Sequence, residues 1–177
     1  MSQLLKMFLP DEHVKDIFEI TPQKLKKRGI KGIITDLDNT LVEWDRPDAT
    51  PKVIEWVKEM EKENIKVTIV SNNNRERVES FSTPLNIQYI FRAKKPLRRA
   101  YERALEIMGL AKDEVVVVGD QLLTDVFGGN RGGFYTILVL PVASTDGFWT
   151  RFNRMIERRI LDWFKKKGLL VWEEQKN

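Results

Sequence analysis

Five short apolar runs, all rich in β-branched residues, alternate with amphipathic segments along this chain. The runs are nearly continuous in apolar residues, which is typical of parallel strands buried on both faces. They cover residues Ile30–Leu37, Ile65–Val70, Ile87–Phe91, Val115–Val118 and Tyr135–Leu140. Helical periodicity lies between them, over Pro51–Glu63, Arg75–Phe81, Pro96–Met108 and a short segment near Thr124–Gly128. The alternation predicts an α/β fold with a parallel sheet, right-handed crossovers and helices on both faces.

The residues outside this alternation are predicted to be additions to a core that spans residues 30–147. Residues 1–29 predict a helical appendage, in which one helix starts at Pro22. Residues 148–177 predict a basic amphipathic helix, because residues 148–168 hold seven basic side chains against two acidic ones and apolar residues recur every three or four positions. The glycine-rich run 128–133 follows a helix rather than a strand. It therefore predicts a helix stop and a turn, not a phosphate-binding loop.

The composition excludes several classes of protein. The 177 residues include no Cys and one His, which rules out a disulfide framework, a cysteine nucleophile and a zinc site. No apolar run approaches the roughly 20 residues that a membrane span needs, and the first ten residues do not resemble a secretory signal. Residues 1–147 hold 22 basic and 22 acidic side chains, unlike a protein that reads nucleic-acid sequence. We therefore expect a cytoplasmic protein without a sequence-specific nucleic-acid partner.

Acidic residues stand at the ends of two predicted strands. Asp36 and Asp38 end the first strand, Asp120 follows the fourth, and Asp125 lies five positions further on. Ligands of open α/β sheets bind outside the carboxyl ends of the strands, so these carboxylates would meet if the first and fourth strands are neighbours. Three carboxyl-bearing residues at one point, Asp36, Asp38 and Asp120, suit an oxygen-ligand magnesium site. The alternative is that each Asp caps a helix or forms a turn.

Two further strand ends carry residues that suit a phosphoryl group. Ser71 closes the second strand and can donate its hydroxyl to a phosphoryl oxygen, although it could equally cap the helix that starts near Asn74. Lys95 precedes a predicted helix and supplies a positive charge, unless that charge is simply solvated. Together with the acidic residues, these two side chains predict a phosphate-binding site at the carboxyl edge of the sheet.

The order and spacing of these residues resemble the four motifs of the haloacid-dehalogenase superfamily of phosphohydrolases. The motifs are Asp36-Leu37-Asp38-Asn39-Thr40, Ser71, Lys95-Pro96 and Gly119-Asp120 with Asp125. More narrowly, nearly the whole chain resembles the YqeG-type subfamily, which is similar to fungal mitochondrial phosphatases that convert phosphatidylglycerophosphate to phosphatidylglycerol. The resemblance implies a three-layer Rossmann-like fold without a cap domain. It also implies that the five strands, numbered along the chain, lie in the order 5-4-1-2-3.

The same resemblance implies a role for each site residue. Asp36 would attack phosphorus to give an aspartyl-phosphate, and Asp38 would protonate the leaving oxygen and then activate water. Mg²⁺ would bind the Asp36 carboxylate, the Asp38 backbone carbonyl and Asp120. The phosphoryl group would be held by residues of three motifs, namely Thr40, Ser71, Asn72 and Lys95. Asp125 would orient Lys95 or a metal-bound water.

The spacing of the motifs leaves no room for a cap domain, because 35 positions separate Asp36 from Ser71 and 24 separate Ser71 from Lys95. An uncapped site suits a phosphate carried on something bulky. The resemblance implies phosphatidylglycerophosphate as the leading substrate, and the alternatives are a phosphoprotein, a nucleotide or a small phosphorylated metabolite. The basic C-terminal helix would either lie on an anionic membrane, at its inner face, or pack on the sheet. A non-catalytic protein of this fold that binds membrane, RNA or a partner protein is the alternative of another class.

Overall fold

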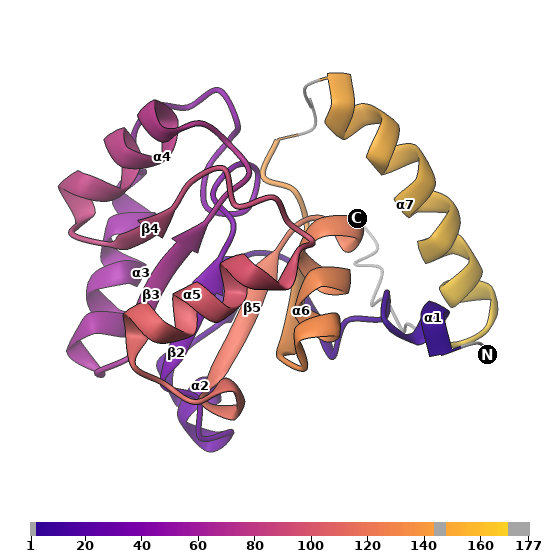
Figure 1. Cartoon of the computed structure of the whole chain (residues 1–177), viewed down its shortest axis with the longest axis horizontal. Helices are drawn as coiled ribbons and strands as arrows, with labels where there is room; N and C mark the ends of the chain where they lie inside the picture. Colours follow the sequence, from indigo (N-terminus) through magenta and orange to yellow (C-terminus); the bar gives the residue numbers. More distant parts are fainter. Residues whose placement is uncertain (1–2, 144–147, 170–177) are drawn as a thin grey trace. The chain divides into compact units, whose positions relative to one another are not determined.

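A parallel sheet forms the centre of the fold (Figure 1), in a computed structural model that describes residues 3–143 and 148–169. Among the described residues the sheet has six strands in the order β1-β6-β5-β2-β3-β4, and every neighbouring pair is parallel. The strands are β1 (Glu12–Val14), β2 (Gly32–Thr35), β3 (Lys66–Val70), β4 (Gln88–Ile90), β5 (Val115–Gly119) and β6 (Tyr135–Val139). The predicted α/β fold class is therefore confirmed.

The strand order differs from the predicted one by one strand. The five predicted strands are β2 to β6, and their order β6-β5-β2-β3-β4 matches the expectation. Outside β6 lies β1, in the segment for which the sequence predicts a helical appendage. This strand pairs with Ile137–Val139, and the Asp11 carboxylate beside it accepts the Thr136 N–H at 2.8 Å. Its three residues are too few to show a strand period, so the long-range pairing with β6 decides its conformation.

Helices cover both faces of the sheet. In the part of the chain up to residue 144 they are α1 (Gln3–Lys6), α2 (Pro22–Lys27), α3 (Pro51–Lys62), α4 (Arg75–Ser82), α5 (Arg98–Met108) and α6 (Phe127–Gly132). A further helix, α7 (Phe148–Lys166), follows in the rest of the chain. Shorter helical turns are η1 (Ile17–Glu19), η2 (Thr83–Leu85), η3 (Lys112–Glu114) and η4 (Leu122–Val126). Successive residues of a strand point to opposite faces. In β2, Ile33 therefore joins the apolar core under α3 and α4, whereas Ile34 joins the core under α5.

The glycine-rich run is helical, which corrects the predicted stop at this point. The helix α6 continues through it to Gly132 and ends at Gly133, which has a φ of 78°. Close packing explains the glycines: a Cβ on Gly128 would lie 2.4 Å from the Tyr101 hydroxyl oxygen, and one on Gly129 would lie 2.6 Å from the Thr136 methyl. Tertiary contacts thus keep these residues small and helical, although glycine disfavours a helix.

The chain divides into two units, one up to residue 144 and the other from residue 145. The second unit contains α7, which begins at Phe148 and ends at Lys166, within the predicted C-terminal segment 148–177. Three stretches of the predicted parts lie outside the described residues: 1–2 of the appendage, 144–147 of the core and 170–177 of the C-terminal helix. Whether α7 packs on the sheet or on a membrane stays a prediction. In the described ranges, every helix is too short or too polar to span a bilayer.

Candidate active site

The predicted site residues gather at the carboxyl edge of the sheet. Asp36 follows β2, Ser71 follows β3, and Asp120 follows β5. Because β2 lies between β3 and β5, these three strand ends are neighbours. Lys95 reaches the same place from the loop between β4 and α5, and Asp125 reaches it from η4. All five side chains are buried, so the site combines four polar strand-end or loop residues and a lysine in a region that water hardly enters.

Lys95 links two of the carboxylates. Its Nζ lies 2.6 Å from Asp125 Oδ1 and 3.0 Å from Asp36 Oδ1. Burial by itself would lower the pKa of the Lys95 ammonium, but the charges of Asp125 and Asp36 outweigh burial and raise it. Burial raises the pKa of the Asp125 carboxyl, and the Lys95 charge opposes part of that rise. Lys95 is therefore a positive charge held beside Asp36 and Asp125, and the predicted roles of Asp125 stay predictions.

Three carboxylates form a group that could hold a metal ion. Oxygen atoms of Asp36, Asp120 and Asp125 all lie within 4.8 Å of one another. Thr40 donates its hydroxyl to Asp120 Oδ1 at 2.9 Å, which fixes that carboxylate. An all-oxygen donor set of this charge fits a hard divalent cation, because three buried carboxylates need more positive charge than one lysine supplies. The group differs from the predicted set in having Asp125 as its third member, and the predicted contribution of Asp38 through its backbone carbonyl stays a prediction.

Gly119 makes room for this arrangement. A Cβ at this position would lie 2.2 Å from Asp125 Cγ and 2.3 Å from its Oδ2. The same carboxylate accepts the Gln121 N–H through Oδ2 at 3.1 Å, so it sits directly against the end of β5. The two residues Gly119 and Asp120 thus contribute in different ways. Asp120 supplies a carboxylate, and Gly119 leaves space for the carboxylate of Asp125.

Asp38 has a different environment from Asp36, although only one residue separates them. Asn73 donates to Asp38 Oδ2 at 2.8 Å, and the Arg77 Nε donates to Oδ1 at 3.0 Å. Burial raises the pKa of Asp38, and the nearby Asp36 charge adds to the rise, whereas Asn73 and Arg77 lower it. Arg77 also donates to the Pro47 carbonyl at 3.1 Å, which ties α4 to the loop after β2. The side chain of Asp38 is half-buried, so it can exchange protons with solvent more readily than Asp36 can.

Sequence reasoning missed Asn73 and Arg77 as partners of Asp38. Neither residue ends a strand: Asn73 lies in the turn before α4, and Arg77 lies in its first turn. The available signal was the run Asn72-Asn73-Asn74, since three amides directly after a strand exceed what one helix cap requires. In the structure Asn74 is that cap, and it accepts the Arg77 N–H at 2.9 Å. Ser71 is therefore not the cap of α4, and its hydroxyl instead accepts the Asn73 N–H at 3.1 Å.

Asn72 holds the backbone of Lys95. Its Oδ1 accepts the Lys95 N–H at 2.7 Å, and its Nδ2 donates to the Lys95 carbonyl at 3.2 Å. The two bonds join the turn after β3 to the loop after β4, so they fix where the Lys95 side chain starts. The sequence predicts Asn72, Thr40, Ser71 and Lys95 as residues that contact substrate, and those contacts stay predictions.

The observed site agrees with the class of hydrolase that the motifs suggest. Two aspartates follow a central strand of the parallel sheet, and a buried lysine and an acidic cluster lie next to them. A family model described as haloacid dehalogenase-like hydrolase matches residues 8–133, and the chain belongs to that family. The predicted enzyme class, a phosphatase of this superfamily, is thereby confirmed. It follows that a phosphorylated compound is the substrate.

The similar proteins are consistent with this class. The chain is 66% identical over 171 residues to a protein of Bacillus subtilis (strain 168) named "probable phosphatase YqeG", covering 97% of this chain and 99% of that protein. It is 31% identical over 175 residues to "phosphatidylglycerophosphate phosphatase 1, chloroplastic/mitochondrial" of Arabidopsis thaliana. That match covers 91% of this chain but 49% of the plant protein. The subfamily resemblance predicted from the motifs is confirmed.

Solved structures share the fold. The cobalt-bound deoxy-D-mannose-octulosonate 8-phosphate phosphatase of Haemophilus influenzae superposes with a TM-score of 0.54 at 15% identity, covering 85% of this chain and 96% of that one. An uncharacterized protein from Listeria monocytogenes superposes with a TM-score of 0.52 at 18% identity, covering 66% of this chain and 85% of that chain. At these identities the likeness concerns the fold alone.

Proposed function

We propose that this chain is a magnesium-dependent phosphomonoester hydrolase that forms an aspartyl-phosphate on Asp36, and that its substrate is phosphatidylglycerophosphate. One observation carries the chemistry. Asp36 lies buried against a lysine and two further carboxylates, whereas Asp38 lies half-buried against an amide and a guanidinium. Two carboxylates with such different surroundings suit the two different roles of nucleophile and acid–base group.

The reaction would proceed in two steps. Asp36 Oδ1 already accepts from Lys95 and from the Leu37 N–H, so we assign Oδ2 as the attacking atom. It forms a bond to phosphorus while the bond from phosphorus to the leaving oxygen breaks, and Asp38 gives its proton to that oxygen. Asp38 then takes a proton from a water molecule, whose oxygen attacks the phosphorus and releases Asp36 and inorganic phosphate. Lys95 and Ser71 would hold the phosphoryl oxygens in both steps.

Asp36, Asp120 and Asp125 would hold the metal ion. Mg²⁺ suits their carboxylate oxygens, and when bound it would offset their negative charge and polarise a phosphoryl oxygen. Thr40 keeps the Asp120 carboxylate oriented, and Lys95 keeps Asp36 and Asp125 in place. The chain's own residues thus supply both the nucleophile and a preformed group of oxygens for the cation.

Two observations support a lipid substrate. The plant relative carries the name of a phosphatidylglycerophosphate phosphatase, although the chain spans about half of its length. In addition, only α3 and β3 lie between Asp36 and Ser71, and only α4, η2 and β4 lie between Ser71 and Lys95, so no cap domain is inserted there. A site without a cap can accept a headgroup that protrudes from a bilayer. With this substrate, the enzyme would act as a peripheral protein at the cytoplasmic face of a membrane.

The test compares phosphate release from an aryl phosphate, short-chain phosphatidylglycerophosphate, sugar phosphates, nucleotides and a phosphopeptide, each with and without Mg²⁺. We expect magnesium-dependent hydrolysis, with the lipid as the most efficient substrate. Asp36→Asn should lower turnover more than about a thousandfold, because no other group replaces the nucleophile, while the circular dichroism melting curve keeps its shape. Asp45→Asn, at an exposed position of the same loop, is the matched control.

Two results would count against the proposal. Turnover by Asp36→Asn above about a thousandth of wild type would remove Asp36 as nucleophile. More efficient hydrolysis of a sugar phosphate, a nucleotide or the phosphopeptide than of the lipid would replace the substrate but keep the chemistry.

A further inference from the structure

Exposed apolar side chains concentrate at the edge of the sheet that carries the site. Among the large apolar residues described up to residue 143, the four most exposed are Leu97 at 54%, Val142 at 44%, Trp44 at 43% and Leu140 at 40%. Trp44 lies on the loop after β2, Leu97 on the loop after β4, and the other two on the segment after β6. All four therefore belong to loops that leave the carboxyl ends of strands.

The backbone N–H groups of three of these residues are hydrogen-bonded to residues near the site. Asn39, three positions after Asp36, accepts the Trp44 N–H through Oδ1 at 3.2 Å and the Val142 N–H through its carbonyl at 2.9 Å. Leu97 follows Lys95 by two positions, and its N–H is donated to the Lys94 carbonyl at 3.0 Å. The exposed apolar groups are thus held by the same loops that hold the catalytic groups. A tryptophan and aliphatic side chains kept in water in this way are typical of a surface that contacts a partner or a membrane interface.

Exposed basic residues lie beside these apolar side chains on the loop after β4. Arg92 and Lys94 are exposed and have left-handed backbone conformations, with φ of 45° and 56°. Their loop is fastened to the turn after β3, because the Arg92 N–H is donated to the Asn73 carbonyl at 2.9 Å and the Ala93 N–H to the Ser71 carbonyl at 3.0 Å. Left-handed backbone at two residues other than glycine is unusual, and here it accompanies cations directed outward beside Lys95.

Charge on this edge is uneven. Two more exposed cations begin α5 directly after Leu97, namely Arg98, which pairs with Glu102, and Arg99. The loop after β2 carries the exposed Asp45 and Asp48 beyond Trp44, and its exposed cation, Arg46, pairs with Glu43. The positive side of the edge is therefore the side of Lys95. An anionic surface would attract the Lys95 side of the edge through charge. On the Trp44 side, the contact would come mainly from the burial of apolar side chains.

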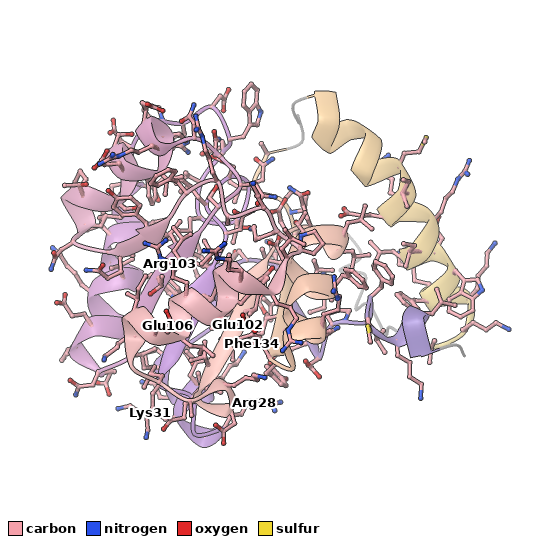
Figure 2. All side chains as sticks on the ribbon, in the orientation of Figure 1. Arg28, Lys31, Glu102, Arg103, Glu106 and Phe134 are labelled. Atoms are coloured by element: carbon pink, nitrogen blue, oxygen red, sulfur yellow. The ribbon has the colours of Figure 1, made fainter. Side chains whose placement is uncertain are left out.

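The opposite edge of the sheet has a different surface. Lys31, which precedes β2, pairs with Glu114 at 2.5 Å, and Lys26 pairs with Glu63. Figure 2 shows Lys31 and Arg28 at this far end, and it shows Glu102, Arg103 and Glu106 together on α5 between the two edges. Lys31 and Lys26 there each pair with a carboxylate, which offsets their charge, and Arg28 lies over the Tyr135 ring at 4.3 Å from its centroid.

We propose that the carboxyl-edge face, defined by Trp44, Arg92, Lys94, Leu97 and Val142, docks on the surface of a bilayer that contains anionic lipid. Trp44, Leu97 and Val142 would enter the interfacial layer, while Arg92 and Lys94 contact anionic headgroups. Such docking would bring Asp36 toward a phosphomonoester that protrudes from the same bilayer. The inference deepens the proposed function and rests on it for the identity of the substrate, but vesicle binding itself is measured without any turnover.

The experiment measures co-sedimentation of the full chain with vesicles of phosphatidylcholine alone and of phosphatidylcholine mixed with phosphatidylglycerol. We expect binding to the mixed vesicles that weakens as salt is added. Arg92→Gln/Lys94→Gln should weaken it about tenfold or more, since each basic residue near an anionic surface adds to the affinity. The control Lys58→Gln/Lys112→Gln removes the same charge from exposed positions elsewhere and should leave binding within about twofold.

The apolar contribution is tested in the same way. Trp44→Ser/Leu97→Ser should weaken binding at both low and high salt, because apolar burial is little affected by screening. Met7→Ser/Ile107→Ser changes two side chains of similar exposure that lie away from the edge, and it should bind as wild type does. Thermal melting of each variant separates loss of binding from loss of folding.

Three results would overturn the inference: no binding of wild type at low salt, equal losses in the edge and control variants, or loss of binding in Arg158→Gln/Arg159→Gln alone, which would assign the contact to α7.

Failure of the proposed function gives a different result. If soluble short-chain phosphatidylglycerophosphate is not hydrolysed while the edge variants still lose vesicle binding, the docking face stands and the substrate does not. If the soluble lipid is hydrolysed and the vesicles are never bound, the proposed substrate stands and the docking face does not.

Discussion

Lysine–carboxylate pairs occur at both edges of the sheet, yet their surroundings are opposite. At the amino edge, the side chains of Lys31 and Glu114 are 62% and 27% exposed. At the carboxyl edge, those of Lys95 and Asp125 are 3% and 2% exposed. An exposed pair contributes little to stability, whereas a buried pair bears a desolvation cost and becomes costly when one partner is removed. The comparison indicates that the charges of the amino edge are solvated, whereas those of the carboxyl edge are kept buried.

Removal of the central lysine should give the largest change in stability. Lys95→Gln would leave Asp36 and Asp125 buried without their ammonium partner, and we expect the free energy of unfolding to fall by ~3–5 kcal/mol without metal. Lys94→Gln changes the neighbouring, exposed lysine and is the control. Chemical denaturation measures both variants. Equal stability of the two would mean that the buried pair has no special cost.

A smaller loss should follow when the close approach at β5 is blocked. In Gly119→Ala, the new methyl would overlap the Asp125 carboxyl group, so we expect a loss of about 1–3 kcal/mol from overpacking. Asp125→Ala removes the overlapping group. In a double-mutant cycle the two changes should therefore be strongly non-additive. Additive losses would show that Gly119 has another function.

Asn73 should affect the pH profile rather than the stability. Its amide lowers the pKa of Asp38. Asn73→Ala should therefore raise that pKa and move the limb of the pH–activity profile that reports Asp38 to higher pH. Ser80→Ala, an exposed change on α4, is the control. An unchanged limb, with turnover of an aryl phosphate measured across the pH range, would contradict the assignment of Asp38 as the acid–base group.

The amino edge should give the smallest effect. Glu114 raises the pKa of Lys31 through a hydrogen bond and through its charge. The pair therefore contributes its full, small stability at neutral pH and loses it as pH rises past the pKa of the lysine. Lys31→Gln should lower the melting temperature less than Lys95→Gln or Gly119→Ala does, and its difference from wild type should vanish in high salt. A difference in melting temperature that persists in high salt would show that the Lys31–Glu114 pair is not screened by solvent, and that it resembles the buried pair more than its exposure indicates.

The sequence allowed much of the site to be predicted because its chemistry stands at strand ends. Asp36, Ser71 and Asp120 each end an apolar run, and parallel strands bring such ends to one edge. What escaped prediction depends on contacts distant in sequence. Strand β1 is defined by its pairing with β6, and Arg77 is defined by its bond to Asp38, which lies 39 positions earlier. The helical glycines of α6 escaped for the same reason, since Tyr101 and Thr136 impose their small size.

The place of β2 in the sheet has a consequence for biosynthesis. This strand is flanked by β3, which is made soon after it, and by β5, which begins at residue 115. While the ribosome is still making the intervening residues, β2 presents an unpaired edge, and such edges invite pairing with other chains. The acidic cluster is likewise complete only once Asp125 has emerged. The nascent chain therefore exposes an unpaired edge at a strand whose four residues are all buried in the folded protein.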